Sequence, residues 1–216
     1  MAMDVILQQL AGGFLRSLGI FVWTLVLSVP FGFVVCKGRM SRIKVVSGLV
    51  KIYIDIMRGT PLMLQLFAWY FAPPLIFGVQ MPTQYRFVAL IIGFTLNYAA
   101  YFAEIYRSGI QSMPVGQYEA AKILGYSKKQ RFHKIILPQV IKRVLPAMTN
   151  EVITLVKDTS LAYAISYSEL FAIAKQIAAA QTTVSVIFIA GVFYFVFNYI
   201  VSFVMGRIEK KLAYYH

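Results

Sequence analysis

Long apolar runs alternate with short basic segments along most of this chain. The runs lie near residues 13–36, 51–71, 87–106, 140–165 and 184–205, and each is long enough to cross about 30 Å of hydrocarbon at ~1.5 Å per helical residue. Residues 167–183 are polar at both ends and predict a helix at the membrane surface. The pattern predicts an all-α integral membrane protein with about five transmembrane helices.

Two stretches interrupt or separate these runs. DIMRGTP at 55–61 breaks the second run, and APPLIFGVQMPTQYR at 72–86 predicts a loop, because its prolines should end the preceding helix. No polar linker or internal repeat divides the chain. Residues 1–216 are therefore expected to form a single transmembrane domain. The first span is expected to be retained, because no basic segment and cleavage site mark a signal peptide.

Composition agrees with a membrane protein and orients it. Hydrophobic residues make up 59% of the chain and charged residues only 13%, too few to cover a soluble domain. Of the 21 Lys and Arg residues, sixteen lie at 37–51, at 107–143 and after residue 206. These segments follow the first, third and fifth spans, so all three lie on the same side of the membrane. By the positive-inside rule the N-terminus lies outside and the C-terminus in the cytoplasm. The net charge of +13 then faces anionic lipid and a partner rather than nucleic acid.

The basic segment EAAKILGYSKKQRFHKIILP at 119–138 has the features of two short helices. Helix-forming residues end at Gly125, which suits a helix C-terminus. Ser127 and Gln130 have the spacing of a capping box that starts a second helix, and Pro138 suits the first turn of the next span. The simpler alternative is a solvated basic loop. The caps favour a helix–turn–helix on the cytoplasmic side.

The same segment resembles the EAA loop of binding-protein-dependent ABC importer permeases. The motif is Glu-Ala-Ala, three residues, Gly, nine residues, then Ile-x-Leu-Pro, and both spacings agree. In that family the loop, here about 114–138, couples the spans to a separate ATPase subunit. By resemblance, the coupling residues are Glu119, Ala120, Ala121, Gly125, Leu137 and Pro138.

Three further segments resemble the polar amino acid (histidine/glutamine/arginine-type) branch of these permeases. They are RGTPLMLQLF at 58–67, NYAAYFAEIYRSGIQSMPVGQYEAA at 97–121 and KDTSLAYAI at 157–165. The resemblance implies a type I ABC importer core in a bacterial inner membrane. It also implies two ATPase subunits, a second permease copy or a paralogue, and an extracytoplasmic solute-binding protein that delivers the amino acid.

Chemistry that the chain lacks supports this division of labour. It has no G-x-x-x-x-G-K-[ST] motif for nucleotide phosphates. It also has no clustered Cys/His set or nucleophile–base pair that would indicate a metal site or an enzyme. We therefore expect a transporter subunit with no catalytic residue, metal or cofactor of its own, and expect ATP and Mg²⁺ to be bound by the partner ATPase.

Charged side chains inside a membrane are costly and mark candidate functional positions. Asp55 and Arg58 are three residues apart and could pair with each other, a structural interpretation that we favour over substrate contact. Two polar stripes suit a solute path at mid-membrane. One stripe consists of Asn97, Tyr101 and Glu104, and the other of Ala147, Glu151, Thr154 and Asp158.

The carboxylates in these stripes favour a cationic solute such as arginine, lysine or histidine. They could equally bond to other helices, since Glu104 and Asp158 lie in motifs that resemble the whole branch. Glu151, near the middle of its span, is the first candidate for substrate contact. The predicted substrate-binding set is Glu151, Asp158, Glu104, Asn97, Thr154 and Asp55.

Two other functions compete with the importer subunit. An ion-coupled secondary amino acid carrier would use the intramembrane acids as proton or sodium sites, but it has no use for the segment at 119–138. A structural subunit of a larger membrane complex leaves the polar stripes unexplained. The sequence favours the importer permease and leaves open which amino acid is carried and whether the two permeases are identical.

Overall fold

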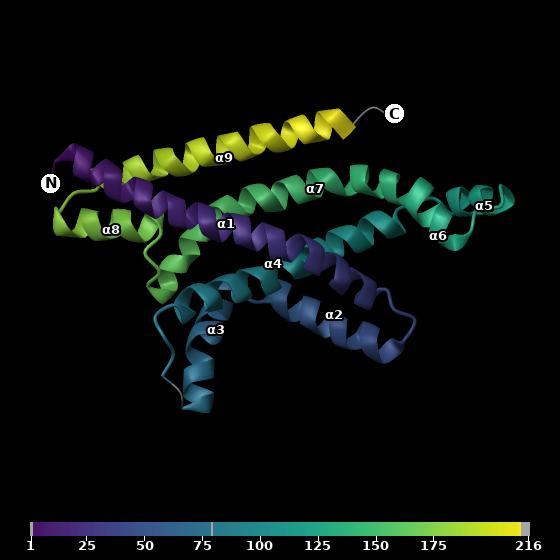
Figure 1. The fold of residues 1–216 in the computed structure, drawn as a ribbon, viewed down its shortest axis with the longest axis horizontal. Coiled ribbons are helices and arrows are strands. Elements are labelled where there is room, and N and C mark those ends of the chain that lie inside the picture. The colour runs from purple at the N-terminus through teal and green to yellow at the C-terminus, as the bar shows by residue number, and fades with distance from the viewer. Residues whose placement is uncertain (1, 79, 213–216) are drawn as a thin grey trace.

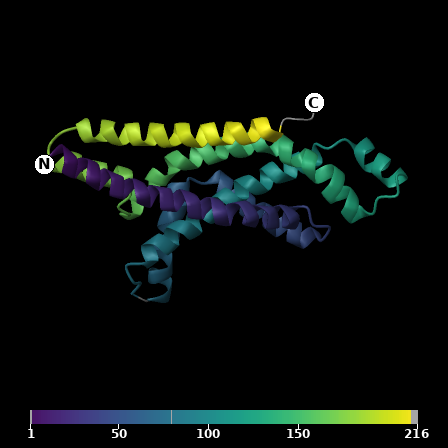
Figure 2. The same cartoon turned by 45° about the horizontal axis from the view of Figure 1, so that its top comes forward.

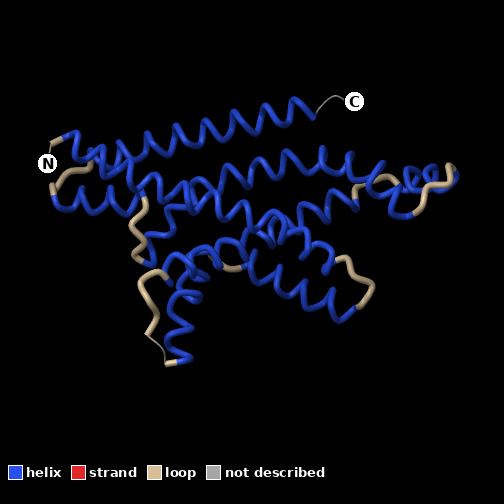
Figure 3. Tube along the Cα trace, viewed as in Figure 1, coloured by secondary structure: helices blue, strands red, loops and turns tan. Residues whose placement is uncertain are grey.

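A computed structural model describes residues 2–78 and 80–212 of the chain (Figure 1). Every element in these ranges is helical, and the helices are joined by short loops (Figure 3). In chain order they are α1 (Met3–Arg39), α2 (Lys44–Gly59), α3 (Leu62–Phe77), α4 (Tyr85–Gln111), α5 (Val115–Ile123), α6 (Lys128–Arg131), a π-helical turn (Phe132–Ile136), α7 (Leu137–Asp158), a 3₁₀ segment (Thr159–Ile165), α8 (Leu170–Ala180) and α9 (Ser185–Leu212).

The described helices supply the predicted spans. By length and hydropathy, three of them (α1, α4 and α9) could each cross a membrane, and α2 with α3 gives a fourth if the pair counts as one broken span. The 22 residues of α7 are also long enough, at about 1.5 Å per residue, although charged residues lower its hydropathy. Together they give the five spans that the sequence predicts.

The long helices α1, α4, α7 and α9 run side by side, whereas α3 turns away from them (Figures 1 and 2). Their shared core is apolar and aromatic, with Phe94, Tyr98 and Phe102 of α4 buried at its centre. These residues are four apart, so they lie on one face of α4, against α1 and α7. This packing fixes α4 and α7, the two helices that carry the predicted polar stripes.

The break between α2 and α3 bends the chain by 109° at Thr60–Pro61. Pro61 has no N–H, so the carbonyl of Met57, four residues earlier, lacks its helical donor. Two buried amides replace it: Gln65 Nε2 and Asn97 Nδ2 donate to Met57 O over 3.0 and 2.9 Å. Asn97 Nδ2 also donates to Gln65 Oε1 over 3.0 Å. The amides therefore stabilise the break and connect it to α4.

The prediction of a loop at 72–86 is wrong for the first half of this segment. α3 continues through Pro73 and Pro74 to Phe77 and ends at Gly78, which has φ +64°. A proline inside a helix leaves the carbonyl four residues earlier unbonded. Here the carbonyl of Trp69 accepts a 2.7 Å hydrogen bond from the hydroxyl of Tyr85, which compensates for Pro73.

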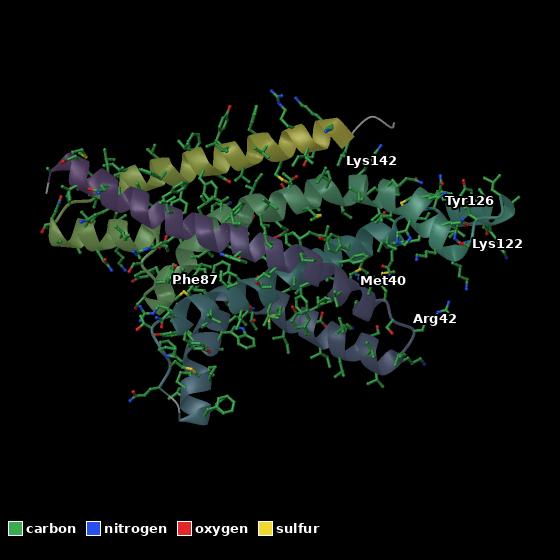
Figure 4. The ribbon with its side chains drawn as sticks, in the orientation of Figure 1. Met40, Arg42, Phe87, Lys122, Tyr126 and Lys142 are labelled. Carbon is green, nitrogen blue, oxygen red and sulfur yellow. The ribbon has the colours of Figure 1, made fainter. Side chains whose placement is uncertain are left out.

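The segment 119–138 forms the predicted helix–turn–helix. α5 ends next to Gly125, which adopts φ +77°, a conformation that glycine accepts without strain. The predicted capping box between Ser127 and Gln130 is confirmed by both reciprocal hydrogen bonds. Figure 4 shows Lys122 and Tyr126 at the tip of this projection and Arg42 in the hairpin between α1 and α2, towards the same end of the molecule.

α8 is a short apolar helix held against α1 and α9 by one buried carboxylate. Glu169 caps it by accepting 2.7 Å hydrogen bonds from the amides of Phe171 and Ala172. The same carboxylate accepts from Ser17 of α1 and Tyr194 of α9. The sequence indicated no role for Glu169, because its partners Ser17 and Tyr194 are far away along the chain and no local pattern connects them to it.

Candidate functional site

A cavity of about 600 Å³ lies between α2, α4 and α7. Its volume falls within the ~300–1,000 Å³ that is usual for small-molecule sites. The walls are rich in charge, and the charged lining residues are Arg58, Glu104, Arg107, Arg143 and Glu151. Charged groups within the spans of an apolar protein mark functional positions, and three arginines and two glutamates gather at this cavity, which makes it the candidate functional site.

The C-terminal half of α4 supplies the best-ordered ion pair. Arg107 donates to Glu104 Oε1 over 2.9 Å and to Oε2 over 2.6 Å, and its third nitrogen donates to Gln111. A bidentate pair between residues three apart on a helix is strong and geometrically fixed. The Glu104 carboxylate is therefore largely satisfied within its own helix.

The predicted pairing of Asp55 with Arg58 is wrong. Arg58 instead lies 3.9 Å from Glu104, and its guanidinium carbon is 5.2 Å from the centre of the Tyr101 ring. Asp55 is exposed and does not line the cavity. The side chain of Arg58 reaches α4 because α2 ends one residue later and packs against that helix.

Arg143 was not among the predicted site residues, and neither was Arg107. Arg143 donates to the carbonyl of Ser112 over 2.6 Å and to its hydroxyl over 3.1 Å, which joins the start of α7 to the end of α4. The i, i+3 spacing of Glu104 and Arg107 was a sequence signal for one of the two. Arg143 had none, because its partner is 31 residues away.

The two predicted polar stripes meet in part. Tyr101 and Glu104 of α4 and Ala147 and Glu151 of α7 line the same cavity. Glu151 makes no direct hydrogen bond or ion pair to any described residue. Its side chain is partly exposed to the cavity, and because it has no partner there, the carboxylate is available to a ligand that enters.

The remaining predicted residues lie outside the cavity. Asp158 accepts a 2.7 Å hydrogen bond from the buried hydroxyl of Tyr98, two helical turns beyond Glu151 on α7. Thr154 lies between them and is half-buried. Asn97 is buried at the α2–α3 break, and both hydrogens of its amide are used there. Within the described residues, no group of His, Cys, Asp and Glu could hold a metal ion.

Within the projecting loop, α5 is bonded to α6, which continues through the π-helical turn into α7. Arg131 donates over 3.1 Å to the carbonyl of Tyr118 in α5, and its guanidinium lies 5.6 Å from the centre of that residue's ring. Ala121 is buried, whereas Ile123 is 86% exposed and Leu124 73% exposed at the tip. Large apolar side chains exposed beyond the spans are typical of a protein–protein contact.

Comparison with known proteins agrees with these features. A model of the family described as "Binding-protein-dependent transport system inner membrane component" matches residues 28–214. The chain is 33% identical to the L-cystine transport system permease protein TcyB of Bacillus subtilis over 208 residues, covering 95% of this chain and 87% of that protein. It is also 33% identical to the arginine transport system permease protein ArtQ of Bacillus subtilis over 201 residues, covering 93% and 90%.

A solved structure has the same fold over nearly the whole chain. It is described as the crystal structure of an amino acid ABC transporter with histidines, and the TM-score is 0.88 at 30% identity, covering 97% of this chain and 96% of that one. The two relatives are permease subunits rather than enzymes. This chain belongs to the family of binding-protein-dependent transport system inner membrane components, as a membrane-embedded permease subunit of an amino acid ABC importer.

Proposed function

We propose that the whole chain, residues 1–216, acts as one permease domain that alternately opens a path for a polar amino acid to either side of the membrane. The single observation that carries the proposal is the physical continuity between a charged cavity and a cytoplasmic docking surface. α7 lines the cavity with Glu151, and its N-terminal end continues into the π-helical turn and α6. Force applied to the loop therefore reaches the cavity through one helix.

The coupling loop, about residues 114–138, would contact a separate ABC ATPase subunit. Ile123 and Leu124 offer exposed apolar contacts, and buried Ala121 allows α5 to lie close to α6. Arg131 bonds α6 to α5, and α6 continues through the π-helical turn into α7, so we expect movement of α5 to be transmitted to α7. In this proposal two ATPase subunits bind ATP and Mg²⁺, and this chain supplies no nucleotide ligand.

The substrate path would run from the cavity along α7 to Asp158. The proposed contacts are Glu151 first, then Asp158 and Thr154. Glu104, also predicted, is a weaker candidate, because both of its oxygens accept hydrogen bonds from Arg107. Asn97 and Asp55, predicted as further contacts, are weaker candidates, since Asn97 holds the α2–α3 break and Asp55 is exposed away from the cavity.

The substrate class is a polar amino acid, and we favour a basic one. The intramembrane carboxylates support arginine, lysine or histidine, and so do the arginine in the name of ArtQ and the histidines in the description of the solved transporter. The name of TcyB, which specifies cystine, shows that the shared fold accommodates other side chains. The ion-coupled carrier is not favoured, because the family is one of binding-protein-dependent importers.

The complete importer would contain a second permease, either a copy of this chain or a paralogue, and an extracytoplasmic protein that delivers the amino acid. The N-terminus would lie outside and the C-terminus in the cytoplasm. The family supports the presence of these partners. The distribution of basic residues supports the orientation of the termini.

The proposal predicts that Gly125→Val uncouples transport. Valine at φ +77° strains the turn after α5 by about 1–2 kcal/mol and misplaces the docking surface. In proteoliposomes that contain the ATPase, the solute-binding protein and internal ATP, we expect the variant to lose most uptake of labelled arginine, histidine, glutamine or cystine. Its thermal unfolding temperature in detergent should fall by only about 2–8 °C, the shift that this strain implies, so that the spans remain folded.

Gly116→Ala is the matched control, because this glycine lies in the same loop, has no positive φ and has open space around its Cα. It should transport normally. Wild-type uptake by Gly125→Val would contradict the assignment of this loop, and uptake without ATP would contradict the importer.

A further inference from the structure

The charged groups of the cavity fall into two classes, those already bonded and those still available. The guanidinium of Arg107 is bonded through all three nitrogens to Glu104 and Gln111, whereas the exposed guanidinium of Arg143 donates through one nitrogen to the carbonyl and hydroxyl of Ser112. Glu104 receives two hydrogen bonds from Arg107. Arg107 and Glu104 form a fixed charged wall, because separating this partly buried pair would leave both charges unpaired.

Arg58 and Glu151 make up the available class. The guanidinium of Arg58 makes no hydrogen bond to a described residue; its contacts are a long ion pair of 3.9 Å with Glu104 and the ring of Tyr101, whose centre is 5.2 Å away. Glu151 has no direct partner among those residues either. The two side chains come from different helices, α2 and α7, and face the same cavity. The cavity thus presents an available anion on α7 and, facing it from α2, a guanidinium without a hydrogen-bond partner among the described residues.

We propose that Arg58 and Glu151 form a clamp for the backbone of the transported amino acid, with Arg58 binding the α-carboxylate and Glu151 the α-ammonium group. The inference rests on the proposed function and assigns its substrate contacts. A guanidinium presents two parallel N–H donors that match the two oxygens of a carboxylate. An ammonium group offers three donors to a carboxylate such as Glu151.

The clamp separates the recognition of an amino acid from the choice among amino acids. Both of its members bind groups that all α-amino acids share, so neither distinguishes a basic side chain from a neutral one. The three arginines also outnumber the two glutamates in this cavity, which favours capture of a carboxylate over capture of an isolated cation. Selection among side chains would then belong to residues elsewhere on the path, such as Asp158.

Equilibrium binding to the purified permease–ATPase complex tests the clamp. The solute-binding protein is left out, because it would impose its own selectivity. L-arginine, L-histidine, L-glutamine and L-cystine are each titrated without nucleotide, and the tightest ligand is compared with its α-amide and its Nα-acetyl derivative. The amide lacks the carboxylate charge, and the acetyl derivative lacks the ammonium charge. Wild type should bind both derivatives about 10- to 100-fold more weakly than the amino acid.

Each variant should abolish one of these two penalties and keep the other. Arg58→Gln should bind the amino acid and the amide equally weakly while it still rejects the acetyl derivative. Glu151→Gln should show the converse. A purely structural role would weaken all three ligands together. Lys51→Gln, an exposed charge on the same helix as Arg58, is the control and should retain wild-type affinities.

Several outcomes would overturn the clamp. They are wild-type ratios in both variants, equal loss of all three ligands in both variants, and no binding of any of the four amino acids by wild type. If Arg58→Gln does not fold, Arg58→Lys tests the clamp instead, because lysine keeps the charge but lacks the two parallel donors. This variant should show a smaller difference in affinity between the amino acid and its α-amide than wild type shows. Failure of the clamp leaves ATP-dependent uptake intact, whereas failure of the proposed function abolishes uptake by wild type.

Discussion

At the scale of single residues, Gly109 sets how closely α4 and α7 approach. A Cβ atom at this position would lie 2.2 Å from Cγ1 of Val144 and 3.3 Å from Cγ1 of Val140. Neither valine can move far, because both are buried in the cluster that connects the cavity to the coupling loop. The close approach of α4 and α7 beside the cavity therefore requires a residue without a side chain at position 109.

Gly109→Ala should destabilise the protein by about 1–3 kcal/mol through overpacking. Val144→Ala in the same chain should restore most of that loss, because it removes the methyl group that the new Cβ meets. Thermal unfolding of the purified single and double variants in detergent measures both effects. Gly19→Ala, with open space around its Cα, should be neutral or slightly stabilising. A double variant no more stable than Gly109→Ala would contradict the proposed contact.

Residue types identified three of the five charged positions of the site, but not their partners. The cost of charge in a membrane singled out Glu104, Glu151 and Arg58 from the sequence. The pairing of Asp55 with Arg58 failed because helical spacing gives only local neighbours. Arg58 meets Glu104 through the packing of α2 on α4, which no pattern within one helix encodes.

At the scale of elements, the broken pair α2–α3 depends on the amides of Gln65 and Asn97. Both donate to the same carbonyl, that of Met57, and Asn97 also donates to the side-chain oxygen of Gln65. Gln65 also donates to the carbonyl and hydroxyl of Thr60. Since the two amides share partners, their contributions to the free energy of unfolding should not be independent.

Gln65→Leu and Asn97→Leu should each destabilise the protein, by about 1–3 kcal/mol, because each leaves buried polar groups unpaired. The double variant should lose less than the sum, with a coupling of about 0.5–3 kcal/mol in a double-mutant cycle. Chemical denaturation in mixed micelles provides the measurement. Asn97→Leu combined with Asn150→Ala, an exposed change on α7, should be additive. Strict additivity of the first pair would show that the amides do not cooperate.

Local chemistry explains which elements could be predicted. Gly125 and the Ser127–Gln130 box are local signals, so the coupling loop followed from the sequence. The continuation of α3 through Pro73 did not, because the carbonyl that proline leaves unbonded is satisfied by Tyr85, beyond the end of that helix. Long-range compensation of this kind has no local pattern.

At the scale of the whole molecule, the distribution of basic residues distinguishes the two ends of the helices. The N-terminus and α8 lie at one end of the helices, and the coupling loop and the end of α9 lie towards the other (Figure 1). Basic residues gather at the second end. Anionic lipid on the cytoplasmic side attracts such residues, so the coupling loop should face the cytoplasm.

Cysteine labelling tests this orientation directly. The chain has a single cysteine, Cys36, which is buried and can be replaced by serine. In that background, Val184→Cys should react with a membrane-impermeant maleimide added to spheroplasts. Arg42→Cys should react only after the membrane is permeabilised, because it lies in the basic hairpin. Both positions are exposed, so each serves as the reactivity control of the other. The reverse pattern would invert the orientation.

The break at Thr60–Pro61 also constrains how this protein can be made. α2 and α3 have 16 residues each, which is too short for either to cross the bilayer alone, and the carbonyl of Met57 receives one of its two donors from Asn97. Asn97 lies on α4 and leaves the ribosome some 40 residues after Met57. Until Asn97 is synthesised, the carbonyl of Met57 lacks one of its two donors, and an unsatisfied carbonyl is costly in the hydrocarbon core. α2, α3 and α4 should therefore leave the insertion machinery together, as one unit of biosynthesis.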